Sequence, residues 1–188
     1  MIWLWLGVLL WSGLHLVKGV APGARTSLIA RIGEIPFKSL IAVGLVGAVV
    51  LMVLGWRTAT PVEVYAPPAW GPAAGLVLVL FGFLLFAWAN VKTNVKRFVR
   101  HPQLTGLALW AAGHLLANGD SRALVLFGGL GLWAVVEIPL INRREGPRVV
   151  PEPVPLKAEV RPALIGLAVF VVVLVVHPWL FGVAGLPV

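Results

Sequence analysis

Four histidines are the side chains of this sequence best suited to bind a metal ion or a cofactor: His15, His101, His114 and His177. Each lies within or beside a long apolar run, where an ionisable group is costly and is therefore a functional candidate. Neutral imidazole is a common ligand of metal ions and of haem iron. The chain has no cysteine and seven carboxylate side chains, so haem suits this inventory better than a zinc or di-iron site. A hydrogen bond to a backbone carbonyl or a neighbouring helix is the alternative interpretation for each histidine.

Two of these histidines belong to one predicted helix. Arg100 and His101 precede Pro102, which suits a first helical turn because its missing N–H is not needed there. Both are expected at the mouth of the helix, where an anion or a polar head group can bind. His114 follows His101 by 13 residues, roughly 20 Å along a helix, so the two cannot ligate one iron. Asn118, one turn beyond His114, is expected to orient its ring by a hydrogen bond.

The elements that hold these residues are predicted to be membrane-spanning helices. Hydrophobic residues make up 60% of the 188 residues and charged residues 12%, whereas a soluble domain averages about 25% charged residues. Apolar runs of up to the ~20 residues that span a bilayer fall at 2–17, 38–56, 69–90, 102–118, 123–141 and 162–184. A segment in lipid must satisfy its own backbone hydrogen bonds, so each run is expected to be a helix. We predict an all-α polytopic transmembrane bundle of about six helices, with residues 1–188 as a single membrane domain.

Lysine and arginine alternate between the loops of this predicted bundle. The second and fourth loops hold only Arg57 and Arg122. The odd-numbered loops carry thirteen of the fifteen basic residues, namely Lys18, Arg25, Arg31, Lys38, Lys92, Lys96, Arg97, Arg100, Arg143, Arg144, Arg148, Lys157 and Arg161. The positive-inside rule places the odd loops in the cytoplasm and both termini outside. The net charge of +8 is therefore attributed to topology, with the lipid bilayer as partner and no nucleic acid.

The acidic and proline-rich positions are expected to be structural. Asp120 follows a turn signal and is expected to cap the next helix. Glu137 is expected near the cytoplasmic end of its helix in a salt bridge with Arg100, Arg143 or Arg144. The segment 142–161 contains four prolines close together and is predicted to be an extended cytoplasmic linker before the last helix.

These residues resemble the NnrU family of bacterial membrane proteins, which is associated with nitrite and nitric oxide reduction. The resemblance covers nearly the whole chain, from the His15 helix and the stretch 21–25 to the block 177–182, and it is strongest over 100–120. It implies a multi-pass protein of the bacterial inner membrane, so the termini that the charge pattern places outside are expected in the periplasm. It also implies respiratory or denitrification proteins as partners.

The 100–120 block is also similar to the plant and cyanobacterial 15-cis-zeta-carotene isomerase, a haem b membrane protein that isomerises a polyene. That resemblance implies haem b, iron ligands at His15 and His114, and a hydrophobic small-molecule substrate. The enzyme has a cysteine three residues before the second histidine, and this cysteine is implicated in redox-linked ligand switching. This chain has Ala111 at that position, so the resemblance does not imply the switch. His177 is expected at a depth closer to that of His114, and the pair His114 and His177 is therefore the alternative ligand set.

Two further functions stay open on the sequence alone. Arg100-His101-Pro102 is similar to a motif of membrane methyltransferases such as isoprenylcysteine carboxyl methyltransferase, which implies an S-adenosylmethionine site lined by Arg100, His101 and Glu137. Those enzymes carry paired glutamates, whereas this chain has Glu137 followed by Ile138. The other function that stays open is that of a non-enzymatic membrane assembly factor whose histidines are structural.

Overall fold

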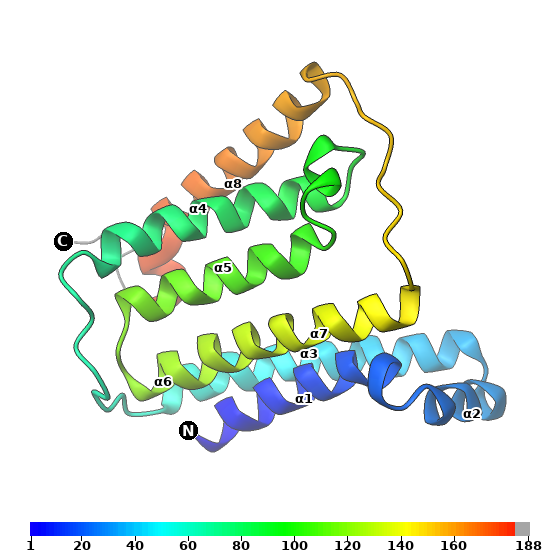
Figure 1. Ribbon diagram of the computed structural model, residues 1–188. Coiled ribbons are helices and arrows are strands. Elements are labelled where there is room, and N and C mark those ends of the chain that lie inside the picture. Colours follow the sequence, from blue (N-terminus) through cyan, green and yellow to red (C-terminus); the bar gives the residue numbers. More distant parts are fainter. Residues whose placement is uncertain (183–188) are drawn as a thin grey trace.

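The computed structural model describes residues 1–182, and these fold as a bundle of helices (Figure 1). In chain order the elements are α1 (Ile2–Val20), α2 (Pro22–Ile32), α3 (Glu34–Thr58), α4 (Gly71–Ala89), η1 (Asn94–Arg97), α5 (Pro102–Ala117), α6 (Ser121–Ala123), η2 (Leu124–Gly128), α7 (Gly129–Glu145) and α8 (Lys157–Phe181). The elements α6, η2 and α7 follow one another without a break as the segment Ser121–Glu145. The predicted all-α membrane bundle is confirmed.

Five segments of the described chain are long and apolar enough to cross a membrane: α1, α3, α4, Ser121–Glu145 and α8. The sixth predicted segment is α5, which has 16 residues and so is about 24 Å long. It starts at Pro102 as the sequence predicted. α2 was not predicted, because its 11 residues mix polar and apolar side chains and bury none of them, which gives no hydropathy signal.

The extended linker is shorter than the predicted 142–161. Residues 142–145 continue α7, which ends where Gly146 takes a positive φ of 74° that only glycine adopts readily. Residues 157–161 already belong to α8. The linker is fixed in place, because the Arg148 guanidinium donates to the carbonyls of Lys96 and Phe98. The Glu159 carboxylate accepts from the loop before η1 at 2.6 Å.

Glycines let the helices approach one another closely. A Cβ on Gly55 of α3 would overlap the backbone nitrogen of Leu4 in α1. A Cβ on Gly75 of α4 would overlap the carbonyl oxygen of Gly113 in α5. Helices in lipid associate by van der Waals packing, and small residues permit it. These two contacts fix α1 against α3 and α4 against α5.

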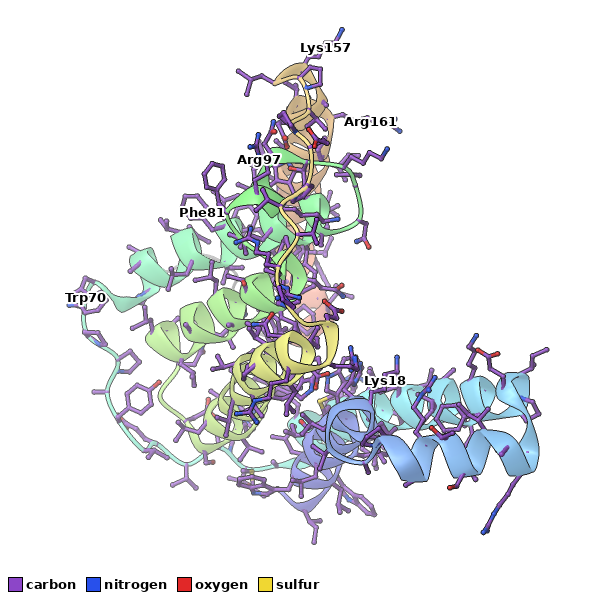
Figure 2. All side chains as sticks on the ribbon, turned by 45° about the vertical axis from the view of Figure 1, so that its right-hand side comes forward. Lys18, Trp70, Phe81, Arg97, Lys157 and Arg161 are labelled. Carbon is purple, nitrogen blue, oxygen red and sulfur yellow. The ribbon has the colours of Figure 1, made fainter. Side chains whose placement is uncertain are left out.

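The basic residues gather at one end of the bundle. The connections α1–α2–α3, α4–α5 and α7–α8 all lie at that end, whereas the N-terminus, the α3–α4 loop and the α5–α6 turn lie at the other (Figure 1). In Figure 2, Arg97, Lys157 and Arg161 lie at the far end of α4 and α8 from Trp70. The separation of charge predicted from the loops is therefore present in the fold. We call the end with the basic residues the basic end and the opposite one the outer end.

Gly55→Ala should destabilise the bundle by about 1–3 kcal/mol, because the new methyl group meets backbone atoms of Leu4 that cannot rotate away. The matched control is Gly47→Ala in the same helix, where nothing lies within 4 Å of a Cβ. It should be neutral, or stabilising by up to about 1 kcal/mol through helix propensity. Unfolding in mixed micelles of increasing SDS fraction measures both. Equal stability of the two variants would contradict the close contact of α1 with α3.

Candidate functional site

A cavity of about 550 Å³ lies between α3, α4, α5, η2 and α8 near the outer end of the bundle. Its volume falls in the range of roughly 300–1,000 Å³ that is usual for small-molecule and cofactor sites. The wall is mostly aromatic and aliphatic, and includes Trp56, Phe83, Trp110, Phe127, Phe170 and Phe181. The polar side chains on it are Arg57, His114, Asn118 and His177. An apolar cavity with a few polar groups is the usual form of a binding site.

His114 is held in one orientation by its own helix. Its Nδ1 lies 2.8 Å from the carbonyl oxygen of Trp110, one turn earlier in α5. A carbonyl only accepts, so the proton of the neutral ring is assigned to Nδ1 and the lone pair to Nε2. Metal-binding histidines characteristically donate their second ring N–H to such a partner. His114 is therefore prepared to offer Nε2 as a ligand.

The π-helical turn η2 brings an aromatic ring onto His114. The ring of Phe127 stacks on the imidazole at a centroid distance of 4.2 Å and an interplanar angle of 22°. Trp110 contacts both rings, at 4.7 Å from His114 and 4.9 Å from Phe127. Single π-helical turns inside longer helices occur often at functional sites. One face of the imidazole is thereby covered, which leaves its edge for a ligand.

His177 reaches the same cavity from α8. It lies one turn before Phe181, whose ring is 4.7 Å from the imidazole. Both imidazoles line the cavity wall. The structure therefore brings together His114 and His177, the pair that the sequence ranked second.

His15 lies outside the wall of this cavity. Its Nδ1 is 2.9 Å from the carbonyl oxygen of Trp11, and its ring lies 4.6 Å from the rings of Trp11 and Trp133. Trp133 is six residues after Phe127, or about 9 Å further along the helix. Two imidazoles on one iron need nitrogens on the order of 4 Å apart, twice a metal–imidazole bond. The structure does not place His15 on the cavity wall that carries His114.

Arg100 and His101 are engaged at the basic end. Arg100 donates to the carbonyl of Gly146 at 3.0 Å and reaches Glu145 at 3.5 Å. His101 Nε2 pairs with the Asn142 side-chain oxygen at 2.9 Å. These contacts tie the start of α5 to the end of α7, and they lie far from the cavity along α5.

Two structural expectations for single residues are wrong. The Asn118 amide donates to the His114 carbonyl at 2.9 Å and not to its ring, because the ring nitrogen in reach is already bonded to Trp110. Glu137 forms no salt bridge with any residue in 1–182: its side chain is turned inward, with 6% exposure, while Arg143 and Arg144 face solvent. The expectation for Asp120 is confirmed, since its carboxylate accepts from the backbone N–H groups of Arg122 and Ala123.

The outer end of α5 is fastened to the α3–α4 loop. The Tyr65 hydroxyl donates to the carbonyls of Leu115 and Asn118, the second at 2.9 Å. The carbonyl of Gly119 accepts from the N–H groups of Val64 and Tyr65. A Cβ on Gly119 would overlap the Tyr65 carbonyl, so glycine is needed there. This outer clasp sets the position of the last turn of α5, which carries His114.

Sequence reasoning missed Arg57 and Tyr65. Arg57 was counted only as a topological charge, although a lone cation at the end of an apolar helix is a signal for an acidic ligand. Tyr65 is the single tyrosine of the chain, and no motif or spacing in the sequence indicated a role for it. Within residues 1–182 no three His, Asp or Glu side chains form a group that could hold a metal ion.

Comparison with known proteins gives one family. A family model described as NnrU protein matches residues 3–185, which is nearly the whole chain. No curated protein and no solved structure matches it.

The single tyrosine should titrate at a higher pH in the folded protein than after denaturation. Burial, and then the nearby Asp120 carboxylate, raise the pKa of Tyr65 above 10.0. The folded state thus keeps the phenol proton longer than the unfolded chain does. Its contribution to stability is complete below pH ~10 and is lost as the pH rises through the raised pKa.

Tyrosinate absorbance against pH measures this shift, with the denatured protein as reference. Asp120→Asn keeps a side chain able to cap the helix and should move the titration part of the way back. Coincident curves for folded and denatured protein would show that Tyr65 is not in the outer clasp.

Proposed function

The chain belongs to the NnrU family, and from this premise we propose that it is a haem b-binding membrane protein whose iron is held by His114 and His177. The observation that carries the proposal is the shared cavity: an imidazole of α5 and an imidazole of α8 line one apolar chamber. As part of the same proposal, the protein acts in nitrite and nitric oxide metabolism with respiratory or denitrification proteins as its partners, as the resemblance of its sequence implies.

The residues present fit a haem. The macrocycle is flat and apolar, and the cavity wall is mostly aliphatic and aromatic. His114 has its Nδ1 bonded to Trp110, which leaves Nε2 for iron. Bis-imidazole ligation from two facing helices is a common way to hold haem in a helical bundle.

Arg57 is suited to bind the propionate carboxylates at the edge of the same cofactor. It lies on the cavity wall and makes no hydrogen bond or ion pair within residues 1–182. Arg122, the other cation of the outer end, is occupied by Asp120 and by the ring of Trp56. Arginine pairs well with carboxylates, so Arg57 takes the propionates in this proposal, in place of Arg100 and His101.

Haem supplies electron transfer and binding of small nitrogen oxides when it is bound. The chain's own residues would hold the iron and orient the macrocycle. The apolar wall of the cavity would exclude water. Isomerase-like chemistry on a hydrophobic small molecule would use the same chamber.

The alternative methyltransferase site is disfavoured by contacts. Arg100 and His101 are bonded to α7, and Glu137 is buried elsewhere along it. None of the three lines the cavity. A purely structural assembly factor has no cofactor spectrum, so absorbance separates it from a haem protein.

Protein expressed with ample haem and purified in detergent should show a Soret band that His114→Ala abolishes. His177→Ala should lose the band or change it to that of a haem with one protein ligand. His15→Ala should leave it unchanged, because His15 lies outside the cavity. His101→Ala is the matched control at the start of the helix that carries His114, and it should keep the native spectrum.

Each other outcome has a definite meaning. A wild-type protein without a Soret band would end the haem proposal. A band that survives His177→Ala but not His15→Ala would assign the iron to His15 and His114 instead.

We further propose that the basic end faces the cytoplasm and that the termini are in the periplasm of the inner membrane. The chain has no cysteine, so single cysteines can be placed without background. Thr60→Cys at the outer end should react with a membrane-impermeant maleimide in spheroplasts. Glu152→Cys in the linker should react only after lysis. The reverse pattern would invert the topology and place the cavity near the cytoplasm.

A further inference from the structure

Three buried polar atoms at the contact of α1 with α7 have no hydrogen-bond partner within residues 1–182. They are Nε1 of Trp11, Nε1 of Trp133 and Oε2 of Glu137. The first two are donors and the third is an acceptor of a carboxylate or a carboxylic acid. An unpaired polar group in an apolar interior costs free energy, and lipid offers no partner.

The rings of this contact lie close together. Trp11 and Trp133 meet edge to face, with centroids 5.9 Å apart and planes at 89°. The imidazole of His15 contacts both indoles at 4.6 Å. Its Nδ1 is bonded to Trp11, so Nε2 is the atom left to face a ligand.

Glu137 lies on the same face of α7. Trp133 contacts α1 at His15, and Leu140 contacts it at Gly19, where a Cβ would lie 3.1 Å from the Leu140 Cβ. Glu137 is four residues after Trp133 and three residues before Leu140. The helical repeat therefore places it between them on the same face of α7. Helical side chains lean toward the N-terminus of their helix, which directs the carboxyl toward Trp133.

No charged side chain of the chain completes this group. On α1 the nearest cation is Lys18, which is exposed at the basic end. On α5 no titratable residue lies between His101, which is bonded to Asn142, and His114. On α7 itself Arg143 and Arg144 are exposed. Within residues 1–182 these three atoms therefore have no partner, and a small bound molecule would supply one.

We propose that Trp11, His15, Trp133 and Glu137 form an internal water-binding site in the α1–α7 contact. Water both donates and accepts, so one or two molecules join the indole N–H groups to the carboxyl, whereas an ion or an apolar ligand satisfies only one kind of atom. Buried waters typically make about three hydrogen bonds to such groups. The site does not depend on haem, and it places exchangeable protons between the basic end and the cavity.

Radiolytic hydroxyl-radical labelling with mass spectrometry tests the proposal, because it marks side chains beside bound water even when they are buried. The full-length protein in detergent is used. Trp133 is 7% exposed and should be labelled well above Leu130, which is 8% exposed but lies in the apolar cluster with Leu4 and Val8 and does not line the cavity. The yields are normalised to the intrinsic reactivity of each residue type.

Glu137→Leu should abolish the labelling of Trp133, whereas Glu137→Gln, which still accepts a hydrogen bond, should retain it. Glu145→Leu makes the same change at an exposed position of α7 and should have no effect. If Glu137→Leu lost its helical circular dichroism, Trp133→Phe would replace it and should lower the labelling of Trp11. The proposal is overturned if Trp133 labels no more than Leu130, or if removing the carboxyl or the indole N–H leaves the labelling unchanged.

Discussion

The lack of water in a bilayer is the constraint on which the rest of this structure depends, because lipid offers a polar group no hydrogen-bond partner, and the partner must come from within the bundle. The two histidines in the bundle interior, His15 and His114, meet this demand in the same way. Each bonds Nδ1 to the carbonyl four residues earlier, and each packs against the tryptophan that supplies it. The same bond satisfies the helix and leaves Nε2 pointing away from the backbone. The hydrogen bond that the buried ring requires thus leaves its other nitrogen available to bind a ligand.

The cavity exists because the two ends of the bundle are fixed by polar contacts while the interior is held by glycines. At the basic end, the Arg148 and Glu159 contacts hold the linker and the start of α8 against the loop between α4 and α5. At the outer end, Tyr65 holds the last turn of α5. α8 packs mainly on α4, through Gly166 and the ring pair of Phe83 and Phe170. Its outer half therefore borders the chamber without filling it, and this half carries His177.

Much of the fold followed from the sequence, because lipid imposes length and polarity on each segment. The six bundle helices lie at the predicted runs, and the charges of their loops separate to the predicted ends. The start of α5 at Pro102 and the cap at Asp120 were local signals, and both are confirmed. α2 was not predicted, because a short helix of mixed polar and apolar residues has the same hydropathy as a loop.

The site was less accessible to sequence reasoning, since it depends on which helix faces which. Depth along a helix can be counted from the sequence, and the count favoured His177 beside His114. Lateral position cannot be counted in this way, and Trp11, Trp110 and Trp133 come between His15 and the cavity only after folding. Glu137 was predicted to pair with an arginine, because Arg143 and Arg144 are close to it in the chain. Arg144 is on the same face as Glu137 but two helical turns, or about 10 Å, further along α7, and both arginines are exposed while the Glu137 side chain is buried.

The two proposed sites differ in polarity, and this difference gives the bundle a direction. Arg57 leaves one uncommitted cation at the outer rim of the cavity, whereas Glu137 leaves one uncommitted acidic group nearer the basic end. Trp11, Trp56 and Trp110 pack against the buried apolar clusters of the interior. A carboxylate-bearing cofactor would therefore turn its acidic edge outward, and water would approach from the opposite side.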